Sequence, residues 1–173
     1  MENAVIAVIT IAIILTGTLT LFLSAFPSID TLSGSWKQMT QQAIELRRTE
    51  ITSDNYTVSG DGEQVEIMVS NNGEVSLSNF TSWDVIVQYY TDNSSSSVKW
   101  LSYTSSAPPD DNEWTVNGIY LNGSAETVEP GILNPGEEMK VLMQFNPSVG
   151  DDTTNRATIS TPNGIATQII FQR

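Results

Sequence analysis

The sequence predicts an α+β fold in which one long, apolar N-terminal α-helix precedes an all-β head. Two observations support this prediction. Residues 4–26 contain no charged side chain, and an uncharged run of this length is typical of a helix that can span a membrane. After residue 53, apolar residues alternate with polar ones, which is the period-two pattern of β-strands. We therefore place a helical domain at residues 1–53 and a β domain at residues 54–173.

The apolar run is long enough to cross a bilayer, since 23 helical residues extend about 35 Å. The first basic residue, Lys37, follows the run rather than preceding it. The positive-inside rule would then put the head in the cytoplasm, although its other features favour an extracellular location. Removal of a basic prepeptide ahead of Met1 would resolve this conflict, and we expect it. An uncleaved membrane anchor with a helical stalk is the alternative.

Helical periodicity continues beyond the apolar run. Apolar residues recur at steps of three and four at Ile29, Leu32, Trp36, Met39, Ala43 and Leu46. This spacing forms a heptad stripe, and polar residues occupy the opposite face of the same helix. A helix that reaches about residue 51 is too long for a single small domain to cover. The stripe therefore predicts a neighbouring helix.

The head contains four clear strand patterns, at residues 65–69, 83–89, 139–145 and 165–171. Weaker patterns occur at residues 56–59, 98–103, 114–121 and 157–161. Turn sequences separate them, including Asn134-Pro-Gly, which suits a type II turn. About eight short strands at this spacing predict an immunoglobulin-like antiparallel sandwich.

Composition excludes several classes of function. The chain has neither Cys nor His, so thiol nucleophiles, disulfides and the usual zinc sites are ruled out. Residues 54–173 carry 16 acids and 4 bases, a net charge of −12, which is unsuited to nucleic acid. Carboxylates cluster at residues 110–113, 137–138 and 151–152, and we interpret them as solvated loops rather than metal sites. We predict no enzyme activity, no cofactor and no metal.

The tryptophans of the head are predicted to be buried. Trp83 lies within a strand pattern and is predicted to be a core residue. Trp100 and Trp114 flank a polar loop, and we expect them to be buried in the core or between subunits. Exposure on the surface is the alternative for these two.

Four N-x-[ST] sequons occur in the head and are candidate N-glycosylation sites on an extracellular surface: Asn55, Asn79, Asn93 and Asn122.

The chain resembles archaellins and, more broadly, archaeal type IV pilin-like filament subunits. The resemblance rests on the N-terminus Met1-Glu-Asn-Ala-Val-Ile-Ala-Val-Ile, on Asn134-Pro-Gly-Glu-Glu-Met-Lys-Val and on Ser160-Thr-Pro-Asn-Gly-Ile-Ala-Thr. It implies a structural subunit of an extracellular helical motility filament with many identical copies. Before assembly the subunit would reside in the cytoplasmic membrane, and a prepilin-type peptidase and an assembly ATPase with its platform would be its partners.

In that interpretation the filament core is built from one face of the N-terminal helix. The polymerisation residues would be Ile6, Ile9, Ile13, Leu15, Leu19, Phe22, Leu32, Trp36 and Met39. Two alternatives share the same architecture. One is an archaellum stator-type protein, anchored in the membrane, whose head binds the surface layer. The other is an adhesive type IV pilus subunit.

Overall fold

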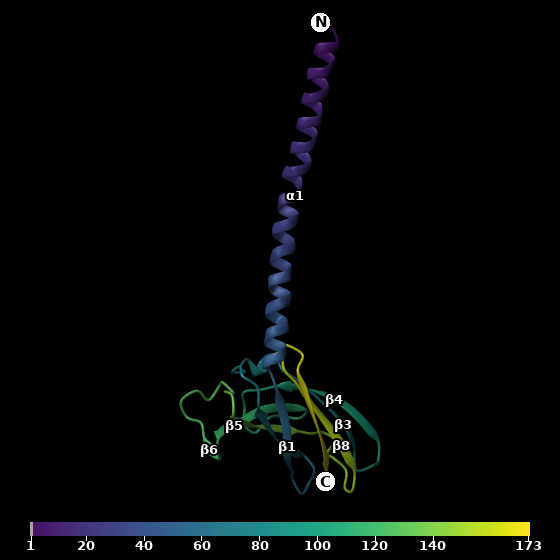
Figure 1. Cartoon of the computed structure of the whole chain (residues 1–173). Helices are drawn as coiled ribbons and strands as arrows, with labels where there is room; N and C mark the ends of the chain where they lie inside the picture. The colour runs from purple at the N-terminus through teal and green to yellow at the C-terminus, as the bar shows by residue number, and fades with distance from the viewer. Residues whose placement is uncertain (1) are drawn as a thin grey trace. The chain divides into compact units, whose positions relative to one another are not determined.

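A computed structural model describes residues 2–173, except for the side chains of residues 25–30. The chain divides into two compact units, residues 1–44 and 45–173. The first unit belongs to the single helix α1, Glu2–Arg48, drawn from purple to blue in Figure 1. Residues 2–24 are apolar and long enough to span a membrane, and none of this span is buried within the protein. Glu2 in the first turn and Arg47 and Arg48 in the last complement the helix dipole.

The second unit is a β structure of two sheets. Its strands are β1 Ile51–Val58, β2 Gln64–Asn71, β3 Asp84–Tyr90, β4 Ser96–Tyr103, β5 Glu113–Leu121, β6 Ser124–Ala125, β7 Glu138–Gln144, β8 Thr154–Ser160 and β9 Ala166–Gln172. The strands follow one continuous order, β1-β2-β7-β5-β4-β3-β8-β9, with β6 beside β5. We divide this order at the short pairing of β5 with β4 into two sheets, β1-β2-β7-β5 and β4-β3-β8-β9. The predicted immunoglobulin-like sandwich is therefore confirmed.

The two sheets are joined rather than separate, which the sequence pattern did not predict. Strand β4 pairs with β5 in parallel over only two residues, Ser102 with Glu113 and Tyr103 with Trp114. On the other side, the hydroxyl groups of Ser53 in β1 and Thr167 in β9 lie 3.0 Å apart and share a hydrogen bond. Figure 1 shows β1 and the yellow C-terminal strand in this part of the head. The sandwich is thus closed at one edge and nearly closed at the other.

The core fills the space between the sheets. Alternate residues of β2, β3 and β7 are buried, so their period-two pattern correctly indicated which side faces inward. Trp83 is buried as predicted, and Trp114 is completely buried, with its ring 5.0 Å from that of Tyr103 in an edge-on contact. Trp100, in contrast, is 60% exposed. The two tryptophans that the sequence left undecided therefore have opposite environments.

Turn chemistry follows the sequence prediction. The N–H of Glu137 donates to the carbonyl of Asn134 at 3.0 Å, and Gly136 has a φ of 83°. These are the features of a type II turn with Pro135 at its second position. The turn at residues 161–164 joins β8 to β9. In this turn the N–H of Gly164 donates to the carbonyl of Thr161 at 2.9 Å.

The first hairpin turn is organised around the carboxylate of Asp61. The hydroxyl of Ser59 and the N–H of Glu63 both donate to Asp61 Oδ1. These bonds, that from Ser59 first, hold the pKa of Asp61 below its ordinary value of 3.8. A carboxyl whose folded pKa is depressed stabilises the fold above its unfolded pKa, and this contribution is lost as the pH falls through the folded pKa.

We expect Asp61→Asn to lower the thermal unfolding midpoint slightly at about pH 6 and by less at about pH 3, because part of the wild-type stabilisation is already lost below the ordinary pKa of 3.8. The change is small because Asp61 is exposed to solvent. Thermal unfolding of both proteins at the two pH values measures the difference. The same loss at both values would show that the charge of Asp61 has no part in the effect.

Candidate functional site

The β4-β3-β8-β9 sheet has an apolar outer face, although no element of the head covers it. Val98, Trp100 and Ile170 are each about 60% exposed there, and Tyr90 and Ile86 are 45% and 41% exposed. Residues 51–173 are all described and contain eight exposed large apolar side chains, of which these are five. The others, Tyr56, Leu121 and Val128, are outside this sheet. We call the outward side of these four strands the apolar face.

Strand register places these residues side by side. Ile86 in β3 pairs with Trp100 in β4, and Gln88 pairs with Val98 in the next outward row. Gln88 also pairs with Arg156 in β8, which in turn pairs with Ile170 in β9. One continuous row therefore crosses all four strands, with an exposed aliphatic side chain at each end. A hollow of about 320 Å³ lies over this row and is lined by Val98, Arg156 and Ile170, among others.

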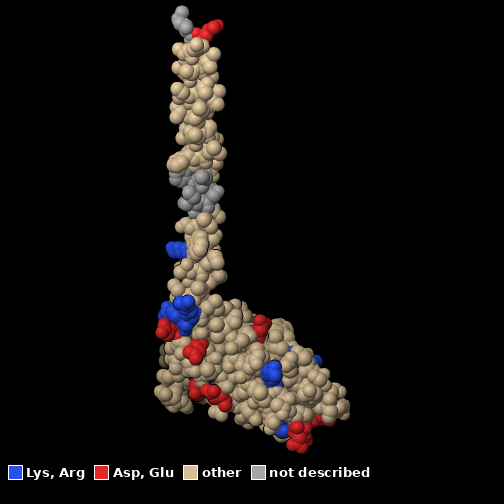
Figure 2. Space-filling view, turned by 45° about the vertical axis from the view of Figure 1, so that its right-hand side comes forward, with Lys and Arg blue, Asp and Glu red and all other residues tan. Residues whose placement is uncertain are grey.

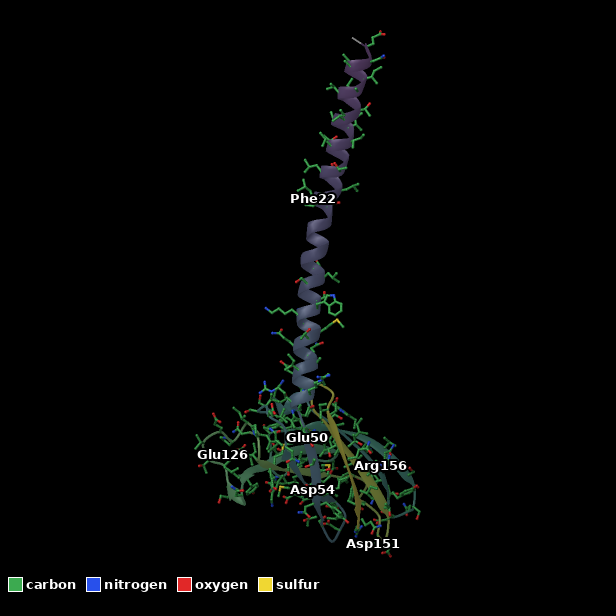
Figure 3. The ribbon with its side chains drawn as sticks, viewed as in Figure 1. Phe22, Glu50, Asp54, Glu126, Asp151 and Arg156 are labelled. Carbon is green, nitrogen blue, oxygen red and sulfur yellow. The ribbon has the colours of Figure 1, made fainter. Side chains whose placement is uncertain are left out.

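The apolar face differs from the rest of the head in charge. Its outward positions carry one acid, Asp84, and one base, Arg156, so its charges sum to zero while residues 54–173 together carry −12. Asp84 is occupied by a hydrogen bond from Trp100 Nε1 at 2.9 Å, which holds the exposed indole in place. Figure 3 labels Arg156 on the head, with Asp151 and Glu126 elsewhere on it. A neutral face allows another protein to approach without the repulsion that the acidic surface imposes.

The opposite sheet presents a different surface. Glu66 of β2 and Lys140 of β7 form an ion pair of 2.9 Å there, and the hydrogen bond from Lys140 to Glu66 raises the pKa of Lys140 above its ordinary value. Since a raised folded pKa stabilises below the unfolded value, this pair contributes throughout the neutral range. The two sheets are therefore distinguished by paired charges on one outer side and exposed apolar groups on the other.

The titratable groups of the head have structural surroundings. Among the residues that the structure describes, no group of three or more acids could hold a metal ion. The shifts in pKa have structural causes. Burial raises the pKa of Tyr89, and hydrogen bonds from the N–H groups of Val128 and Glu129 lower that of Glu126, a loop residue.

Comparison with known proteins identifies the head. Residues 47–167 match the family model described as conserved flagellar protein F, immunoglobulin-like domain. The chain belongs to this family. The description of the family refers to the flagellum and names no chemical reaction. A search of curated proteins found no match.

Solved structures share the fold. The archaellum periplasmic stator protein complex FlaF and FlaG from Sulfolobus acidocaldarius aligns with a TM-score of 0.52 and 21% identity, over 71% of this chain and 89% of that one. The stator protein FlaG from the same organism aligns with a TM-score of 0.52 and 20% identity, over 71% and 99%. The archaeal flagellum of Methanospirillum hungatei strain JF1 aligns over 93% of this chain and 90% of that one, with a lower TM-score of 0.47 and 14% identity.

These findings correct the functional prediction. The chain is not an archaellin-type filament subunit, because its head belongs to the flagellar protein F family. The predicted partners, which were a filament of identical copies, its peptidase and its assembly ATPase, are wrong for the same reason. The physical cause of the error is that both kinds of protein place an apolar helix before a β-sandwich. Helix periodicity therefore cannot distinguish them.

The nine residues predicted to drive polymerisation all lie on α1, with exposures between 54% and 65%. Figure 3 shows the side chains of the helix, Phe22 among them, radiating from its ribbon. In Figure 2 the described helix surface is tan between the acidic first turn and the grey segment. An apolar surface of this length is suited to contact with membrane lipid, so its composition does not require burial in a filament core.

The sequons have different local structures. Asn55 lies in β1, paired with Met68, and the side chain of Asn79 is bonded to the hydroxyls of Ser82 and Thr81. Asn93 and Asn122 lie in exposed turns, after β3 and β5 respectively.

Proposed function

We propose that this protein is a membrane-anchored stator subunit of an archaellum-type motility machine. The apolar part of α1 would hold the chain in the cytoplasmic membrane, and the head would lie outside the cytoplasm. The family match over residues 47–167 carries this proposal. The resemblance of the head to archaellum periplasmic stator proteins supports it, as does the apolar span at residues 2–24.

We further propose that the head binds a second stator chain of the FlaG kind. A related stator protein has been solved as a complex of FlaF and FlaG, and the apolar face is the part of this head best suited to such a contact. Exposed apolar patches rimmed by polar residues mark protein contacts. Trp and Tyr anchors with a central Arg are typical of the residues that dominate binding energy.

Cell fractionation combined with affinity capture tests this function. We expect the full-length tagged chain in the membrane fraction, and we expect it to capture a second chain that has an apolar N-terminal helix and an immunoglobulin-like head. Deletion of the gene should abolish swimming. Recovery of this chain as the main protein of sheared surface filaments would contradict the proposal. So would swimming that is unchanged in the deletion strain.

The sequons remain part of this proposal. Exposed turns are more accessible than paired strands, so an enzyme acting on the folded head would modify Asn93 and Asn122 before Asn55. Mass spectrometry of peptides from the captured protein tests this order.

A further inference from the structure

Three polar side chains meet on the outer side of the β1-β2-β7-β5 sheet, away from the apolar face. They come from the adjacent strands β2, β7 and β5. Glu66 Oε1 lies 2.9 Å from Nζ of Lys140, and Glu66 Oε2 accepts a hydrogen bond from Nδ2 of Asn117 at 3.2 Å. One carboxylate therefore holds an amine and a carboxamide beside each other.

An irregularity in strand β5 brings Asn117 to this position. The pairing of β5 with β7 is interrupted between Val116 and Ile119, so Asn117 and Gly118 together stand opposite the single residue Lys140. A bulge of this kind turns a side chain away from its regular direction, and bulges are frequent next to reactive sites. Gly118 has a φ of 142°, which favours glycine.

The cluster is partly shielded from water. The side chains of Lys140 and Glu66 are only 30% and 26% exposed. Nζ of Lys140 lies 5.5 Å from the centre of the Tyr120 ring, and the same ring packs so closely over Gly118 that a Cβ there would lie 3.0 Å from the Tyr120 hydroxyl oxygen. A simple surface ion pair requires neither the carboxamide nor the bulge.

From this arrangement we infer that Lys140 and Asn117 form an isopeptide bond between β7 and β5, with Glu66 as the proton carrier. The amine of Lys140 attacks Cγ of Asn117, so a bond between Nζ and Cγ forms. The bond between Cγ and Nδ2 breaks, and Nδ2 keeps its electron pair. Two protons leave Nζ and pass through the Glu66 carboxylate to Nδ2, which departs as an ammonium ion. Glu66 is a carboxylate again at the end, and the step needs no oxidant or other reactant.

The ion pair is the resting state of this site. The hydrogen bond from Lys140 to Glu66 raises the pKa of the amine, so the neutral amine that attacks is scarce at neutral pH. Two features offset this scarcity. Groups held in the right orientation react as if at effective molarities of about 10⁵ M or more, and a positioned acid–base group contributes a further factor of about 10² to 10⁴. The bond therefore forms slowly as the protein matures, and faster as the pH rises toward the pKa of Lys140.

The cross-link would give the head a covalent support that its composition otherwise lacks. The chain has no cysteine and therefore no disulfide. The bond closes the loop from residue 117 to residue 140, which contains β6 and the exposed segment around Val128. Closing such a loop restricts the unfolded chain and stabilises the fold, as a disulfide does. This inference concerns the durability of the head and does not depend on the proposed stator function.

Mass spectrometry of the full-length protein detects the bond directly. The protein is measured when freshly purified and again after incubation at about pH 7 and about pH 9. We expect the intact mass to fall by one ammonia, and to do so sooner at the higher pH. Fragmentation should show the peptide that contains Asn117 joined to the peptide that contains Lys140. A protein that keeps its full mass under both conditions would overturn the inference.

Lys140→Arg is the deciding variant, because a guanidinium keeps the charge opposite Glu66 but does not attack a carboxamide. It should retain its full mass. Lys99→Arg makes the same change at the other lysine of the head and should lose ammonia as the wild type does. This comparison excludes a competing reaction, in which Asn117 closes a ring onto the N–H of Gly118 and also releases ammonia. The same loss from the Lys140→Arg protein would assign it to ring closure and overturn the inference.

Glu66→Gln tests the proton carrier, because the amine and the carboxamide both remain. We expect the bond to form roughly 100-fold more slowly in this variant. Thermal unfolding of each purified variant verifies that the head is folded. Formation of the bond at the wild-type rate would overturn the role of Glu66.

Discussion

Val98→Asp is expected to weaken binding of the proposed second stator chain by roughly 100-fold, or about 2.8 kcal/mol. Val98 lies at the end of the row that crosses the apolar face and is 62% exposed in the isolated head. A contact over this face would remove the side chain from water. An introduced carboxylate would then be buried without a partner, since Arg156 is separated from it by Gln88.

The chain offers a matched control in Val128→Asp. Val128 is 85% exposed in a loop away from the apolar face, so the same substitution there should leave binding unchanged. Val98→Thr keeps the β-branched shape of the strand residue without a charge, and it separates an effect on the strand from an effect on the contact. Affinities are measured with full-length proteins in detergent, alongside thermal unfolding of each variant. Normal binding by the Val98→Asp protein would exclude the apolar face as the binding surface.

Asn71→Ala is expected to destabilise the head by about 3 kcal/mol, because it leaves buried polar groups without partners. The side chain of Asn71 is completely buried. Its Nδ2 donates to the carbonyls of Val75 and Leu133, each at 2.9 Å, and its Oδ1 accepts from the N–H of Gly73 at 3.0 Å. One amide thus joins the end of β2 to two separate loops.

The neighbouring Asn72 provides the control. Its side chain is exposed and donates to the Thr52 hydroxyl at 2.9 Å, so Asn72→Ala should cost less than about 1 kcal/mol. Urea unfolding of the head unit, residues 45–173, reports the difference through the fluorescence of the buried Trp83 and Trp114. If both variants lose the same stability, the network around Asn71 does not hold the loops together.

Local pattern was sufficient for much of the head. Strands β2, β3 and β7 were predicted because each has one buried side and one side that is more exposed to solvent. Apolar and polar residues therefore alternate along their sequences. The turns at residues 134–137 and 161–164 were predicted because Pro fixes φ and Gly accepts the positive φ that the turn requires. Strand β1 was predicted only from residue 56, whereas it begins at Ile51. Its outward residues are polar and its pairing is interrupted between Ser53 and Asn55, so alternation is weak there.

The apolar face could not be predicted in the same way. Val98 and Ile170 lie at the two ends of one row across four strands, but they are 72 positions apart in sequence. A single exposed aliphatic residue in one strand is common at protein surfaces. It indicates an apolar face only when the strand register places other exposed apolar residues beside it. The functional error has a related cause. The heptad stripe predicts that another helix packs beside it, but it does not indicate whether that helix belongs to a filament.

The sequence by itself determined the apolar helix, the acidic all-β head, the absence of Cys and His chemistry, and the type of its best-defined turns. These properties depend on residues close together in the chain. The tertiary structure decided which tryptophan is buried, how β4 and β5 join the two sheets, where Asn71 donates its hydrogen bonds, and which surface is apolar and without net charge. Those properties depend on pairings between distant strands, and their energies arise only when the strands meet.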